Sequence, residues 1–168
     1  MIVMDRAQNA ADQWARERPE IDTGTMVLLG RLAEAALVIA RDKLTPLFAR
    51  FDLQPGEFDV LATLRRSGTP HALTPTELYE TAMISSGSMT NRIDRLEKIG
   101  LVVRKPNPAD KRGTLVALTA QGAALIDRVI DAHVVNQQTI VSGLSVREQS
   151  QLSGLLAKLL KAQETPEP

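Results

Sequence analysis

Two short stretches of the chain carry polar and cationic side chains of the kinds that bind nucleic acids. In the first, hydroxyl, amide and guanidinium groups recur within ten residues: Ser86, Ser88, Thr90, Asn91 and Arg95. In the second, one acidic and two basic residues are adjacent: Asp110, Lys111 and Arg112. Such groups hydrogen-bond the edges of bases and pair with phosphates. The two stretches predict a DNA-binding surface, with Asp110 holding the Arg112 guanidinium for insertion into a minor groove.

The residues around the first stretch predict two helices joined by a turn. The sequence Thr-Pro-Thr-Glu at 74–77 combines an N-cap, a proline at the first helical position and a capping-box glutamate. That helix is expected to end near Thr81. A second helix is expected to start at Ser85 or Ser86 and to stop at Gly100, which tolerates the left-handed conformation of a helix end.

The second helix has one buried stripe, made by three apolar residues: Met89, Ile93 and Leu96. At about 100° per residue, Asn91 and Arg95 point roughly 130° to 170° away from the centre of this stripe. Arg92 lies only about 60° to 70° from it. We therefore expect Asn91 and Arg95 to face DNA, and Arg92 to lean toward the rest of the domain.

After Gly100, residues 101–104 and 114–118 are apolar and rich in β-branched types, which predicts two strands. The loop between them, 105–113, is interpreted as too long for a tight hairpin and carries three cations. Taken alone, the loop favours a solvated hairpin with a weak surface ion pair. Because it follows a helix pair directly, we favour DNA contact. This order of elements is that of a winged helix-turn-helix.

These motifs resemble the MarR family of bacterial transcriptional regulators. The matching residues are the small residues at 85–88, the run RLEKIGLV at 95–102, Arg104, the wing residues 110–112, and Leu118-Thr119 followed by Gly122. The resemblance implies a mainly α fold with a small β-wing, and a single MarR-type domain over residues 21–163. In it, a winged-helix domain at about 53–119 is flanked by dimerisation helices at about 23–50 and 119–163.

Composition narrows the function classes. The formal net charge is zero, but residues 86–112 hold seven cations and three anions, which is a local basic patch. The chain has no cysteine, and its two histidines lack metal-ligand spacing, so no metal and no cofactor are expected. No hydrolase, nucleotide-binding or metalloprotease motif is present, so we expect no enzymatic activity. No signal peptide or membrane-length apolar run occurs, and the protein is expected to be cytoplasmic.

The flanking segments predict long helices with apolar stripes. One is expected at 23–49, a second is opened by Thr119, and a third begins with a capping box at Ser145. Their stripes can pack on the winged domain or on a second copy of the chain, and we favour a homodimer. Its two recognition helices would lie about one DNA turn, roughly 34 to 36 Å, apart on a pseudo-palindromic operator. Residues 164–168 are expected to be a disordered tail.

Two further residues bear on a regulatory ligand. Asp59 lies inside an almost wholly apolar helix, so it should have a cationic partner or face a wet pocket. An ion pair with Arg65 or Arg66 is the simpler reading. Trp14 is the only tryptophan and lies in an expected N-terminal extension helix, residues 1–20. That helix could cover a cleft or serve as a packing anchor.

The extension is similar to that of the urate-responsive branch of MarR regulators, the HucR, PecS and MftR proteins. The ligand-site pattern of that branch matches four positions in this chain: Trp14, Asp59, Arg92 and Arg104. The resemblance implies a homodimeric repressor released by a small anionic aromatic molecule such as urate. The alternatives are a regulator of another phenolic or carboxylate ligand, and a winged-helix protein-interaction module.

Overall fold

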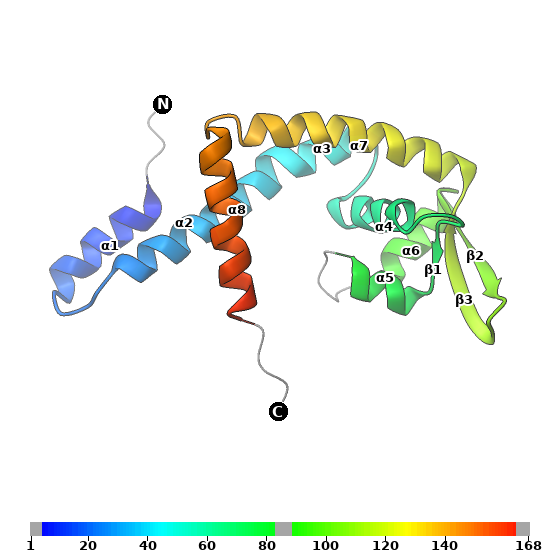
Figure 1. Cartoon of the computed structure of the whole chain (residues 1–168), viewed down its shortest axis with the longest axis horizontal. Coiled ribbons are helices and arrows are strands. Elements are labelled where there is room, and N and C mark those ends of the chain that lie inside the picture. The colour runs from blue at the N-terminus through cyan, green and yellow to red at the C-terminus, as the bar shows by residue number, and fades with distance from the viewer. Residues whose placement is uncertain (1–4, 83–88, 164–168) are drawn as a thin grey trace.

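The computed structural model describes residues 5–82 and 89–163, without the side chains of Lys111 and Arg112. A winged unit lies at one end of a long helical arm (Figure 1). The elements follow in this order: α1 Arg6–Glu17, α2 Gly24–Ile39, a π-helix Ala40–Leu44, α3 Thr45–Ala49, α4 Pro55–Arg66, β1 Ala72–Leu73, α5 Pro75–Thr81, α6 Met89–Lys98, β2 Val102–Asn107, β3 Asp110–Leu118, α7 Ala120–Ile140 and α8 Val146–Lys161. The fold is mainly α with a small sheet, as predicted.

The helix predicted at 23–49 is present, but one turn of it is a π-helix. Pro46 has no backbone N–H, so it cannot bond to the carbonyl one turn earlier. Around it the ladder shifts by one residue, and both the N–H and the Oγ1 of Thr45 donate to the Ala40 carbonyl. The arm therefore runs unbroken from Gly24 to Ala49.

The core lies in the winged unit and is centred on α4. Val60, Leu61 and Leu64 of α4 are fully buried. They belong to one apolar cluster with α6, through Ile93 and Leu96, and with α7. Because α6 packs on α4, residues on the inward side of α6 reach the first turns of α4.

The helix-turn-helix has the predicted boundaries wherever the structure describes them. The Thr74 side chain accepts the Glu77 N–H, and the Glu77 carboxylate accepts the Thr74 N–H, which completes the capping box. At the end of α6, Gly100 has φ +77°. Its N–H donates to the Glu97 carbonyl, and the Leu101 N–H donates to that of Leu96. This pair of bonds is a Schellman motif, which needs the left-handed glycine.

The wing is longer in its strands and shorter in its turn than predicted. The sheet has the antiparallel order β1-β3-β2, and Asn107 pairs with Asp110, so the turn consists of Pro108 and Ala109. A register shift after Pro106 takes up the extra residues of β3. The prediction of a long loop over 105–113 was therefore wrong. The charged residues in this range were interpreted as a loop, although they lie in strands. β1 was not predicted, since two residues give no periodic signal.

The flanking helices begin at the predicted caps. Thr119 accepts the Gly122 N–H at the start of α7, and Ser145 forms a capping box with Glu148 at the start of α8. At the other end of the chain, α1 packs on α2 through buried Ala11 and is tied to it by an ion pair from Arg31 to Asp5, 2.6 Å long. None of the helices that the structure describes is long and apolar enough to cross a membrane.

Candidate nucleic-acid interface and ligand site

The outward face of α6 carries Thr90 and Asn91, both exposed. Asn91 lies opposite the buried residues of the same helix, as the periodicity predicts, whereas Thr90 lies about 90° from their centre. Ser86 and Ser88 lie outside the described residues. Lys111 and Arg112 belong to β3 by backbone, but their side chains are likewise outside the described part of the structure. Asp110 is the first residue of β3 and pairs with Asn107 across the wing turn.

Arg95 has a partner that the helical rotation does not suggest. Its guanidinium Nη1 forms an ion pair with Glu57, a carboxylate on α4 that is only 1% exposed. The same carboxylate accepts the Gln54 N–H at 2.8 Å. The ion pair raises the pKa of Arg95 above its ordinary value. The prediction left Arg95 free to face DNA, whereas the structure folds its long side chain back onto α4.

Glu57 is the residue that the sequence analysis missed. Its local signal is its place three residues after Gln54 at the start of α4, which is that of a capping-box glutamate. Such a position indicates the start of a helix and says nothing about burial. The ion pair with Arg95 on α6 therefore cannot be predicted from the neighbouring sequence. Through it, the recognition helix is attached to the core by a charged group as well as by apolar packing.

Arg104, at the start of the wing, is held by the outer side of α6. Its Nη2 donates to Asp94 at 2.6 Å, its Nη1 pairs with Glu97, and its backbone N–H donates to Glu97 at 2.9 Å. The backbone and side-chain bonds from Arg104 lower the pKa of Glu97. In this arrangement β2 and α6 are joined as one unit, and the guanidinium faces two carboxylates.

Arg92 leans inward, as predicted, and lies against the first turn of α4. A Cβ built on Gly56 would be 2.3 Å from the Arg92 Nε, so the two residues are in close contact. The Arg92 Nη1 is buried and has no hydrogen-bond partner among the residues described. A buried guanidinium nitrogen without an acceptor is costly, so binding of an anion at this place would be favourable.

Asp59 is half-buried on α4, one turn after Gly56. Burial raises the pKa of Asp59, and the nearby charges of Arg66 and Arg92 oppose that rise. Within residues 5–82 and 89–163, no ion pair to Asp59 is formed. The simpler reading is therefore wrong: Arg65 pairs with Asp127 at 2.7 Å, and Arg66 donates to the Thr81 carbonyl at 2.8 Å.

The four residues of the expected ligand set do not all meet in one chain. Asp59 and Arg92 interact electrostatically, but Arg104 is turned to the carboxylates of α6. Trp14 is on α1, 46% exposed. Figure 1 shows α1 beside α2, at the end of the arm away from α4 and α6. The single chain thus assembles the Asp59–Arg92 half of the set.

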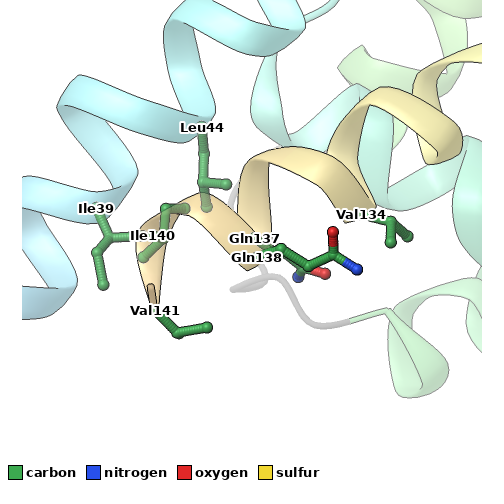
Figure 2. Close-up of a pocket in the computed structure, with 7 residues that line it drawn as sticks. All are labelled: Ile39, Leu44, Val134, Gln137, Gln138, Ile140 and Val141. Carbon is green, nitrogen blue, oxygen red and sulfur yellow. The ribbon is translucent and has the colours of Figure 1, made fainter. Parts of the chain in front are cut away.

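A cleft of about 410 Å³ lies between the arm and α7. Its apolar lining comes from Ile39 and Leu44 on one side and from Val134, Ile140 and Val141 on the other (Figure 2). None of the described residues that line the cleft carries a cationic side chain that could bind an anion. Nor do three metal-ligating side chains gather anywhere in the described ranges.

The sequence is similar to a known protein family and to individual transcriptional regulators. The model described as the MarR family matches residues 51–113, which span α4 to the wing. The chain is 40% identical over 149 residues to the HTH-type transcriptional regulator PecS of Dickeya dadantii, covering 89% of each protein. It is 33% identical over 138 residues to the multiple antibiotic resistance protein MarR of Escherichia coli, covering 80% of this chain and 92% of that protein.

Two solved structures of transcriptional regulators have a fold similar to that of this chain. A mutant MarR from E. coli in complex with operator DNA superposes with a TM-score of 0.70 at 30% identity, over 88% of this chain and 97% of that one. Sco3205, a regulator from Streptomyces coelicolor in complex with DNA, has a TM-score of 0.75 over 87% of this chain and 91% of that one. Its identity is 24%, so that likeness concerns the fold alone.

Proposed function

Because the chain belongs to the MarR family of DNA-binding transcriptional regulators, we propose that it is a homodimeric repressor released from its operator by a small anionic ligand. One observation carries the proposal. Arg92 stands on α6, the proposed recognition helix, yet it is turned inward beside Asp59, and its buried Nη1 has no partner among the described residues. A ligand that engages Arg92 therefore acts directly on the recognition helix.

The proposed DNA surface combines α6 with the wing. Thr90 and Asn91 are exposed on α6 and can reach base edges in a major groove. Ser86 and Ser88 precede them in the sequence, and Lys111 and Arg112, positioned by Asp110, would contact the minor groove and phosphates. The Nη1 of Arg95 is engaged by Glu57, although the side chain is 43% exposed. We therefore assign it first to holding α6 in place.

The homodimer is supported by unpartnered apolar surface on the flanking helices. None of the residues of α8 is buried, and Leu152, Leu155 and Leu160 are between 47% and 69% exposed. The cleft of Figure 2 is likewise apolar and open. A surface of this kind is typical of an interface, and a second copy supplies a matching one by symmetry. The dimer would read a pseudo-palindromic operator.

The proposed effector is a planar anion such as urate, bound by Arg92 and in competition with Asp59. Its charge would satisfy the guanidinium, and its entry would displace the Asp59 carboxylate. Binding then shifts the protein toward a state with lower DNA affinity, by the ligand's differential affinity for the two states. Arg104 would join the site by leaving Asp94 and Glu97. Trp14 would join it only if the partner copy supplied it.

Gel-shift titration with the DNA upstream of the protein's own gene tests the function. We expect binding at low salt that weakens steeply as salt rises, because neutralised phosphates release counterions. Urate should release the DNA from the wild type, but not from Arg92→Ala or Asp59→Ala. No shift at low salt contradicts the DNA target, and full urate release from both variants contradicts the ligand site.

Sedimentation at micromolar concentration tests the dimer separately. The wild type should sediment as a dimer, and Leu152→Glu should shift it toward monomer, because it places a charge on the apolar stripe of α8. Lys158→Glu is the matched control, since Lys158 lies about 120° around the helix from Leu152. A monomeric wild type contradicts the homodimer.

A further inference from the structure

Gly56, in the first turn of α4, lies directly against the Arg92 side chain. A Cβ added at this position would come within 2.3 Å of the Arg92 Nε, 2.6 Å of its Cζ and 3.0 Å of its Cδ. Ordinary van der Waals contact begins at about 3.4 Å. The space that the guanidinium occupies therefore exists only because residue 56 has no side chain.

The backbone of α4 gives no other reason for glycine at this position. Gly56 lies inside a helix, whereas Gly68 and Gly100 have positive φ values that favour glycine. Within a helix, glycine is less stabilising than alanine, because it loses more conformational freedom on folding. Helix α4 thus carries a residue of low helix propensity in its first turn, at the position where the Arg92 side chain needs room.

Gly56 and Asp59 share one side of α4, because residues three apart in a helix are neighbours. The flat surface at Gly56 admits the Arg92 side chain, and Asp59 supplies a negative charge nearby. With Arg92 in this position, its Nη1 is buried and lacks an acceptor within the described part of the chain. The glycine determines that the guanidinium is held at α4 and does not extend into solvent.

We propose that Gly56 is a positioning residue of the effector site: its missing side chain lets Arg92 of the recognition helix dock on α4 beside Asp59. The role in ligand response rests on the proposed function, but the docking itself does not. Any larger residue at 56 would displace the guanidinium. Because arginine is long and flexible, that displacement costs the fold little, while it separates Arg92 from Asp59.

The first test is direct. The Arg92 guanidinium Nη1–H resonances in low-temperature ¹⁵N spectra are identified as those lost in Arg92→Lys, and their exchange with water is measured, because Nη1 is the buried nitrogen. We expect slow exchange in the wild type and fast exchange in Gly56→Ala. Gly154→Ala is the matched control, because Gly154 is also helical and a Cβ there meets nothing within 4 Å. Fast exchange in the wild type, or slow exchange retained in Gly56→Ala, overturns the proposal.

The second test uses urate and a double-mutant cycle. Gly56→Ala should raise the urate concentration needed for half-release of DNA by about tenfold, the equivalent of one charge-assisted hydrogen bond, while Gly154→Ala leaves it unchanged. In the Arg92→Lys background, where residue 92 keeps its charge but lacks the guanidinium that meets Gly56, Gly56→Ala should have no further effect, since it acts through the guanidinium. An equal effect in both backgrounds overturns the proposal. If urate does not release DNA from the wild type, the effector proposal is wrong. The exchange measurement then still tests whether Gly56 lets Arg92 dock on α4.

Discussion

Replacing Arg95 with alanine should destabilise the protein far more than its exposed position on α6 suggests. The variant leaves the Glu57 carboxylate in a site that is 1% exposed, with the Gln54 N–H as its remaining donor. Removing one partner of a fully buried ion pair costs about 3 to 5 kcal/mol. Because the Arg95 side chain is 43% exposed, water can partly replace it, and we expect about 2 to 3 kcal/mol.

The reverse substitution should cost less. Glu57→Gln removes the buried charge, keeps an acceptor for the helix cap and leaves Arg95 free to turn to solvent, so we expect a loss of about 1 kcal/mol. The double variant should be no less stable than Arg95→Ala, because the carboxylate that makes Arg95→Ala costly is gone. The larger loss for Arg95→Ala than for Glu57→Gln is expected because the buried carboxylate depends on its half-exposed cationic partner.

Thermal unfolding measures these differences at one fixed protomer concentration, since dimerisation couples stability to concentration. For a chain of this length, we expect Arg95→Ala to lower Tm by about 5 to 10 °C. Arg128→Ala is the control, because Arg128 is exposed and forms no ion pair with any residue that the structure describes. If Arg95→Ala matched this control, or if the losses simply added in the double variant, the reasoning would be refuted.

Three further predictions concern other parts of the molecule. Burial raises the folded-state pKa of Asp59, so its charge opposes folding at neutral pH; Asp59→Asn should resist urea better than the wild type there, and the gain should vanish as the pH falls through that pKa. Replacing Lys111 and Arg112 with alanine removes four cations from the proposed dimer and should reduce the slope of log affinity against log salt by about four in gel shifts. A Cβ on Gly122 would lie 2.0 Å from the Leu101 carbonyl oxygen, a backbone atom that cannot turn aside, so Gly122→Ala should lose about 3 kcal/mol or more in thermal unfolding.

Sequence alone predicted the helices, their caps and the helix-turn-helix. Thr74, Thr119 and Ser145 cap the helices they were expected to cap, and Gly100 ends α6 in the left-handed conformation. These features depend on hydrogen bonds between residues only a few positions apart, so local sequence contains the information they need. The inward lean of Arg92 followed in the same way from helical periodicity.

Tertiary packing determined which partners the charged side chains contact. Rotation about α6 gives the direction of the Arg95 Cα–Cβ bond, but the side chain is long enough to turn back to Glu57. In the same way, Arg104 was drawn to Asp94 and Glu97, and the register of the wing was set by pairing across β3. Each outcome depends on groups brought together from different elements. The sequence therefore determined the DNA-reading module. Only the fold decided that Arg95 and Arg104 are held by carboxylates, and that Arg92 lies against Gly56 with a buried Nη1 that has no acceptor among the described residues.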